Sequence, residues 1–120
     1  MSIKNIWYLL CYYMTKIKLL ICKTRSGKEP FTDWFNKLDR ASRFKISAAL
    51  FQMEEGNFSD SKFVGKGVWE RRIHAGGGFR IYFAKSGRDF IVLLGGSNKG
   101  GQGLQIRRAH ALWKNQKSNY

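Results

Sequence analysis

The sequence predicts a small α+β domain with a mostly antiparallel sheet packed against helices, in the order β-α-α-β-β-β-α. The chain has 120 residues, of which 43% are hydrophobic and 15% aromatic, enough for one folded core and too many for intrinsic disorder. Helical spacing of apolar residues dominates its first half, and extended runs dominate its second half. A single proline and the lack of a repeat exclude collagen-like, proline-rich and coiled-coil classes.

The first predicted elements are a strand and a short helix. Residues 16–24 are rich in apolar and β-branched side chains and end at the Ser26-Gly27 turn, which is typical of a strand. Pro30 suits the first position of a helix, where its missing N–H costs nothing. Apolar residues then recur at helical spacing: Phe31, Trp34, Phe35 and Leu38.

A second, longer helix is predicted over Ala41–Glu55, and Gly56 ends it. One apolar row on this helix contains Phe44, Ala48 and Phe51. A neighbouring row contains Ile46, Leu50 and Met53. Both rows have the spacing of an amphipathic helix.

The second half of the chain changes to the pattern of strands. Three extended runs end at turn residues: Val68–His74, Phe79–Ala84 and Asp89–Leu94. Residues 75–78 are a glycine-rich hairpin connection between the first two runs. A glycine-rich loop is predicted over Gly95–Gly103, and a closing helix over Leu104–Trp113.

Residues 1–14 are predicted to be an N-terminal extension of a domain at 15–115, and a basic tail follows at 116–120. The extension contains a nine-residue apolar run from Ile6 to Met14. This run is too short to span a bilayer, and no small-residue cleavage site follows it. We interpret it as the product of an upstream start codon, with Met14 as the alternative first residue; a signal peptide is the other interpretation.

Charge and cysteine usage limit the partners. The chain has 22 Lys and Arg against 8 Asp and Glu, a formal net charge of +14, which favours a polyanion such as nucleic acid. Two cysteines cannot build a disulfide framework, and two histidines leave few metal ligands. We therefore expect a cytoplasmic protein without a metal, another cofactor or a membrane partner. Several cations near the C-terminus form a surface that attracts polyanions: Arg107, Arg108, Lys114 and Lys117.

A candidate site follows from the alternation of side chains along the hairpin. Residues two apart on a strand share a face, so Glu70, Arg72 and His74 point to the same side of the sheet. Arg80 and Tyr82 share a face on the next strand. The apolar residues between them are expected in the core. With matching register, all five polar side chains lie together on the other face.

These side chains suit cleavage of RNA by the neighbouring 2′-hydroxyl. The reaction needs a base for the hydroxyl proton, an acid for the departing 5′-oxygen and positive charge for the phosphorane. Arg72 and Arg80 supply the charge in bidentate form. Glu70 or His74 is the candidate base, and Tyr82 or a cation is the candidate acid. The alternative is a cross-strand Glu–Arg pair on a solvated sheet face, with no catalytic role.

Several motifs occur in a fixed order along the chain. They are Ser26-Gly27-Lys28-Glu29-Pro30-Phe31-x-x-Trp34, Glu55-Gly56-Asn57-Phe58-Ser59-Asp60, Gly67-Val68-Trp69-Glu70-x-Arg72-Ile73, Gly76-x-Gly78-Phe79-Arg80-Ile81-Tyr82-Phe83, Leu93-Leu94-x-Gly96, Lys99-x-x-Gln102 and Ile106-x-x-Ala109. As an ordered set they closely resemble the RelE/ParE toxin superfamily, specifically its phage-derived, HigB-like "addiction module killer protein" branch. The resemblance covers about residues 16–115.

The resemblance implies a microbial-RNase-like fold and a toxin that a cognate antitoxin neutralises. Many members cut mRNA, commonly in the ribosomal A site, whereas ParE-like members inhibit DNA gyrase. Lys62 matches a commonly basic position of the branch. The positions that the branch usually keeps match Glu70, Arg72, Arg80, Lys99 and Gln102.

The chain departs from the branch at several positions. Arg71 replaces the usual Leu and puts a charge where the core expects a hydrophobic residue. We expect it to extend to solvent or to mark a poorly covered edge, and to reduce stability. Gly77 stands where Pro is common, and Ser97-Asn98 replaces Gly-Asp in the loop that carries Lys99. His74 matches a variable position, so its catalytic role rests on the strand pattern alone.

We therefore expect the toxin of a type II toxin–antitoxin system, a metal-independent mRNA endoribonuclease that inhibits translation on or off the ribosome. The expected partners are a cognate antitoxin, mRNA and the ribosome. The expected RNA-binding residues are Lys62, Lys99, Gln102, Arg107 and Arg108. Two alternatives stay open: a non-enzymatic DNA gyrase inhibitor, and a degenerate, inactive toxin retained for antitoxin binding.

Overall fold

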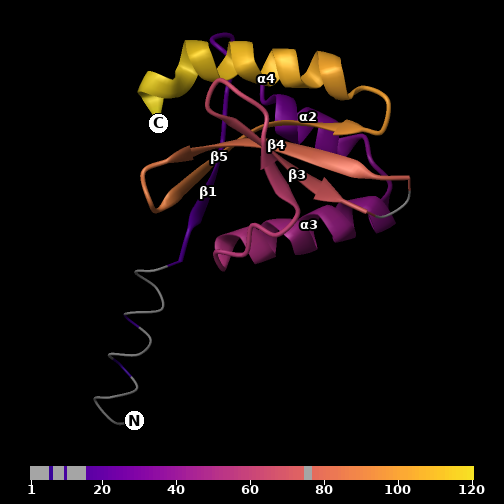
Figure 1. The fold of residues 1–120 in the computed structure, drawn as a ribbon, viewed down its shortest axis with the longest axis horizontal. Coiled ribbons are helices and arrows are strands. Elements are labelled where there is room, and N and C mark those ends of the chain that lie inside the picture. Colours follow the sequence, from indigo (N-terminus) through magenta and orange to yellow (C-terminus); the bar gives the residue numbers. More distant parts are fainter. Residues whose placement is uncertain (1–5, 7–9, 11–15, 75–76) are drawn as a thin grey trace.

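A five-stranded sheet lies between two layers of helices in the computed structural model, which describes Ile6, Leu10, and residues 16–74 and 77–120 (Figure 1). The strands are β1 (Lys18–Ile21), β2 (Ser61–Phe63), β3 (Val68–Ile73), β4 (Phe79–Ser86) and β5 (Phe90–Asn98). Their order across the sheet is β1-β5-β4-β3-β2, with β1 parallel to β5 and the other pairs antiparallel. The predicted α+β class with a mostly antiparallel sheet is confirmed.

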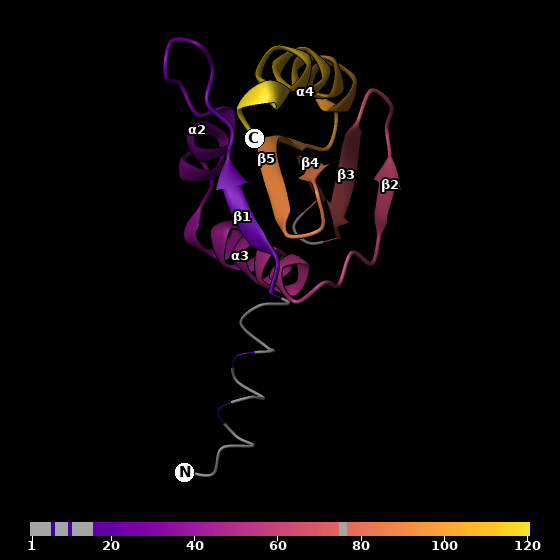
Figure 2. The same cartoon turned by 90° about the vertical axis from the view of Figure 1, so that its left-hand side faces the viewer.

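The helices cover opposite faces of the sheet (Figure 2). Helices α2 (Pro30–Asn36) and α3 (Arg40–Glu54) pack on one face, and α4 (Gln102–Gln116) packs on the other. The core under α2 and α3 contains Phe31, Ile46, Ala49, Met53, Phe79, Ile81, Phe83, Ile91 and Leu93. The core under α4 contains Cys22, Val68, Tyr82, Ala84, Val92, Leu94 and Ala109.

The chain ends in a short 3-10 helix, Lys117–Asn119, which follows α4. Tyr120 then packs back on the domain, where its hydroxyl donates to the carbonyl of Ile21 (3.2 Å) and accepts from the N–H of Lys23 (3.0 Å). Of the expected N-terminal extension, the described residues include only Ile6 and Leu10. Within the described part of the chain, no helix is long and apolar enough to cross a bilayer.

Three details differ from the prediction. Strand β2 was not predicted, because a three-residue edge strand is too short to show alternation. Strand β5 runs through Gly95 and Gly96 to Asn98, where a loop was expected. Glycine in a strand can mark a close approach of another group, and the ring of Trp34 packs directly on Gly96. Helix α4 consequently starts at Gln102, earlier than expected, and runs on to Gln116.

Replacing Gly96 with Ala is expected to destabilise the fold by about 1–3 kcal/mol, the usual cost of overpacking a core. A Cβ at this position would come within 2.1 Å of the Trp34 ring. The indole cannot move freely, because its Nε1 donates to Asn98 Oδ1 (3.0 Å). Urea unfolding measures the loss, and Gly95→Ala is the matched control because a Cβ there meets nothing within 4 Å. Equal stability of the two variants would contradict the packing described here.

Candidate functional site

The strand register gathers the candidate polar residues on the face of the sheet that α4 covers. Across the β3–β4 pair, Glu70 lies opposite Tyr82 and Arg72 lies opposite Arg80. Across the β2–β3 pair, Lys62 lies opposite Glu70. Directly opposed residues of antiparallel strands share a face, so these side chains form two adjacent rows across the sheet.

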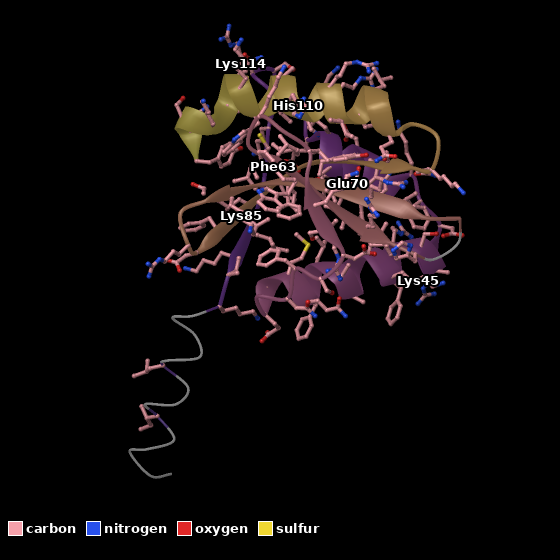
Figure 3. The ribbon with its side chains drawn as sticks, in the orientation of Figure 1. Lys45, Phe63, Glu70, Lys85, His110 and Lys114 are labelled. Carbon is pink, nitrogen blue, oxygen red and sulfur yellow. The ribbon has the colours of Figure 1, made fainter. Side chains whose placement is uncertain are left out.

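Glu70 is the centre of this group. Its carboxylate is fully buried beneath α4 (Figure 3). One oxygen, Oε1, lies 3.4 Å from Arg72 Nε and 3.5 Å from Arg80 Nε. The other, Oε2, accepts a hydrogen bond from Gln102 Nε2 (2.7 Å), at the start of α4. A buried carboxylate needs such pairing, and here it fixes two guanidinium groups side by side.

The two arginines remain accessible although Glu70 is not. The side chain of Arg72 is 35% exposed and that of Arg80 is 20% exposed. The Nε of Arg80 has no hydrogen-bond partner among the described residues, because its contact with Glu70 is an ion pair without hydrogen-bond geometry. This Nε is buried against Glu70, so an anion would reach Arg80 through the exposed part of its side chain.

Tyr82 is fully buried, and its hydroxyl shares a hydrogen bond with Ser97 Oγ (2.8 Å). Burial raises the pKa of this phenol above its ordinary value, against the opposing effect of the Ser97 hydrogen bond. The phenol is therefore protonated at neutral pH. Ser97 was not among the predicted site residues, although it lies opposite Arg80 in the β4–β5 register. Ser97 was missed because residues 95–103 were interpreted as a loop, so the alternation of a strand was not applied to them.

His74 lies just beyond the end of β3, at the edge of the group. Its Nε2 contacts Asp60 Oδ2, and the histidine side chain is 74% exposed. Asp60 adopts a positive φ of 58°, and its carbonyl accepts from the N–H of Arg72 (3.0 Å). The structure thus pairs an accessible imidazole with a carboxylate close to Arg72. Asp60 was not predicted as a site residue.

The expected RNA-binding residues separate into two groups. Lys62 is exposed on the edge strand, and Gln102 is bound to Glu70. Lys99 is exposed at the end of the sheet that carries Arg80, where its N–H donates to the carbonyl of Gly78 (3.3 Å). On α4, by contrast, Arg107 lines a groove with Lys66 and His110, whereas Arg108 lines a different groove with Trp34 and Lys37.

Arg71 points to the opposite face of the sheet and is buried. Its guanidinium donates to the carbonyl and Oγ of Ser59 and to Gln52 Oε1 (2.6 Å). Burial lowers its pKa, against the attraction of Asp60. The expectation that Arg71 extends to solvent is wrong, because polar groups of α3 and the following loop supply partners inside the protein. These bonds hold the loop that carries Asp60.

The described residues include no group of three or more His, Cys, Asp or Glu side chains arranged to hold a metal ion.

A family model described as "Phage derived protein Gp49-like (DUF891)" matches residues 33–112, two thirds of the chain. The chain is also 35% identical over 83 residues to an uncharacterised protein of Haemophilus influenzae, a match that covers 68% of this chain and 84% of that protein. The segment at 33–112 contains every candidate site residue named above.

Proposed function

Because the chain belongs to the Gp49-like family of phage-derived proteins, which is part of the RelE/HigB-like toxin superfamily of toxin–antitoxin systems, we propose that it is a toxin that cleaves mRNA. The membership confirms the toxin superfamily expected from the motifs, whereas the HigB-like branch is part of the proposal. A cognate antitoxin is the partner that the family implies. The mRNA and the ribosome are proposed partners.

The observation that carries the proposal is the arginine pair held by a buried carboxylate. Arg72 and Arg80 lie next to each other on Glu70, and both side chains stay partly exposed to solvent. Two such groups stabilise the charge that builds up on a phosphorane. Glu70 and Tyr82 are fully buried, so we assign them to positioning. Glu70 orients the arginines, and Tyr82 holds Ser97 beside them.

The proposed reaction is transesterification at phosphorus. The 2′-oxygen attacks the phosphorus, and the bond from phosphorus to the 5′-oxygen breaks. His74 accepts the proton of the 2′-hydroxyl, and Asp60 orients the imidazole. The departing 5′-oxygen takes a proton from a cation at the rim, for which Lys99 is the candidate. The products are a 2′,3′-cyclic phosphate and a 5′-hydroxyl end.

Replacing His74 with Gln is expected to lower the cleavage rate by about 10²–10⁴-fold, the usual contribution of a general base. The matched control is His110→Gln, because His110 Nε2 contacts the carbonyl of Val64 (2.9 Å) away from the arginine pair. Single-turnover cleavage of a labelled RNA measures both variants. An unchanged rate in His74→Gln would contradict the role of His74 as the base.

Replacing Lys62 or Lys99 with Ala is expected to reduce the salt dependence of RNA binding. Each lost phosphate contact lowers the slope of log K against log[salt] by about 0.7 for a single strand. Fluorescence anisotropy with a 2′-O-methylated RNA, which lacks the attacking hydroxyl, measures binding without cleavage. Lys18→Ala is the control, since Lys18 is exposed on β1 at the far edge of the sheet. If Lys62→Ala or Lys99→Ala gave the same slope as Lys18→Ala, this result would contradict a phosphate contact of that lysine.

Primer extension on cellular mRNA after induced expression tests the proposed function, with a DNA-supercoiling assay beside it. The proposal predicts new mRNA ends and normal gyrase activity. Inhibited supercoiling without new ends would overturn it in favour of a gyrase inhibitor. A folded protein without growth arrest or new ends would overturn it in favour of an inactive toxin.

A further inference from the structure

No described helix or strand covers the side of α3 that faces away from the sheet (Figures 1 and 2). The helix buries Ile46, Ala49 and Met53 against the sheet. On its other side, Phe44 is 76% exposed and Phe51 is 58% exposed. We call this side the α3 outer row; it consists of Ala41, Phe44, Ala48 and Phe51, all of them exposed. Contiguous exposed apolar patches often mark interaction surfaces.

The N-terminal segment joins the domain at one end of this row. Lys16 Nζ pairs with Glu54 Oε2 (3.3 Å) and lies 5.9 Å from the centroid of the Phe51 ring. The N–H of Ile17 donates to the carbonyl of Glu54 (3.0 Å). These contacts hold Lys16 and Ile17, which directly follow residues 1–15 in the sequence, beside the C-terminal end of α3.

The segment has the composition and length to cover the row. The run at 6–14 contains nine apolar residues, and a helix of that length is about 13.5 Å long. From Ala41 to Phe51 the α3 outer row extends about 15 Å along its helix. Ile6 and Leu10 are four residues apart, the spacing of one helical face, and both expose about half of their surface. The exposed side chains of Ile6 and Leu10 and the α3 outer row thus belong to one chain, and few residues separate the apolar run from Lys16.

We propose that residues 6–14 dock on the α3 outer row of the same chain. Burial of apolar surface on both partners drives the docking, and the short tether keeps the segment at a high effective concentration. A protein that starts at Met14 lacks the cover and exposes Phe44 and Phe51. This inference does not depend on the proposed nuclease activity.

Cross-linking tests the proposal, because the segment carries a native thiol, Cys11. In full-length Ala48→Cys protein, a short bismaleimide is expected to join positions 11 and 48 within one chain. At micromolar protein this reaction should exceed cross-linking between chains by about 1,000-fold, since a short tether gives a millimolar effective concentration. Cys22 is buried and burial raises its pKa, so it stays unreactive. The readouts are the mass of the intact protein and of the linked peptides.

Two controls and one second position complete the test. Ala48→Cys combined with Cys11→Ser should give no link, and neither should Ala111→Cys, which lies exposed on α4 at the opposite face of the sheet. Ala41→Cys tests whether Cys11 lies closer to the N-terminal end of the α3 outer row. Links that join two chains would overturn the proposal in favour of a second copy as the occupant. If Cys11 were linked neither to position 41 nor to position 48, the proposal would be overturned outright.

Discussion

Replacing both Arg72 and Arg80 with Ala is expected to abolish mRNA cleavage and growth arrest. These guanidinium groups lie beside each other on Glu70, and no other pair of cations in the described structure is held by one buried carboxylate. Removing one donor that stabilises transition-state charge costs about 10²–10³-fold, so removing two is expected to cost about 10⁴-fold or more. The initial rate of RNA cleavage by the purified protein measures the loss.

The double variant needs a control for folding, because it leaves the buried Glu70 carboxylate without its cations. Arg72→Lys combined with Arg80→Lys keeps both charges but loses the planar guanidinium geometry, and we expect an intermediate loss of rate. Arg88→Ala removes an exposed arginine from the turn before β5 and is expected to change nothing. Full toxicity of a folded Arg72→Ala, Arg80→Ala protein would contradict the account.

Replacing Arg71 with Ala is expected to lower the free energy of unfolding by about 1.5–3 kcal/mol, the usual contribution of hydrogen bonds to a charged group, because the acceptors lie on the exposed residues Gln52 and Ser59, which water can reach. The substitution removes the partners of the Ser59 carbonyl and of Gln52 Oε1 and leaves a cavity. Urea denaturation measures the change. Because the Ser59–Asp60 loop loses its anchor, cleavage is expected to fall as well.

Arg71→Leu separates the two causes of this loss. Leu fills the space that Ala leaves empty, and replacing a buried ionic group with a hydrophobic one is often neutral or stabilising. We therefore expect Arg71→Leu to be more stable than Arg71→Ala, while the Ser59–Asp60 loop stays unanchored in both. Equal stability of Arg71→Ala and the unmodified protein would contradict the role of the buried guanidinium.

The face of the sheet to which each hairpin side chain points could be predicted, because successive side chains of a strand point to opposite faces. That pattern puts Glu70 with Arg72, and Arg80 with Tyr82, and the register brings the two pairs together. The burial of Glu70 could not be predicted, because it depends on where α4 lies over the sheet. The sheet face that carries these polar side chains is therefore partly covered by α4.

Contacts between distant segments account for what the prediction missed. The partners of Arg71 come from α3 and the next loop, and no local pattern reveals them. Asp60 reaches His74 across fourteen positions of the sequence. The two apolar rows of α3 have similar composition, and only the position of the sheet decides that Ile46 is buried and Phe44 exposed.

The most direct test of the central claim is to sequence the 5′-hydroxyl RNA ends of cells that express the protein. Attack by the 2′-oxygen releases the downstream fragment with a 5′-hydroxyl, so the account predicts new ends of this kind within mRNA. The same cells with the Arg72→Ala, Arg80→Ala variant should lack them. New ends that carry 5′-phosphate, or equal numbers of 5′-hydroxyl ends with the double variant, would contradict cleavage by this arginine pair.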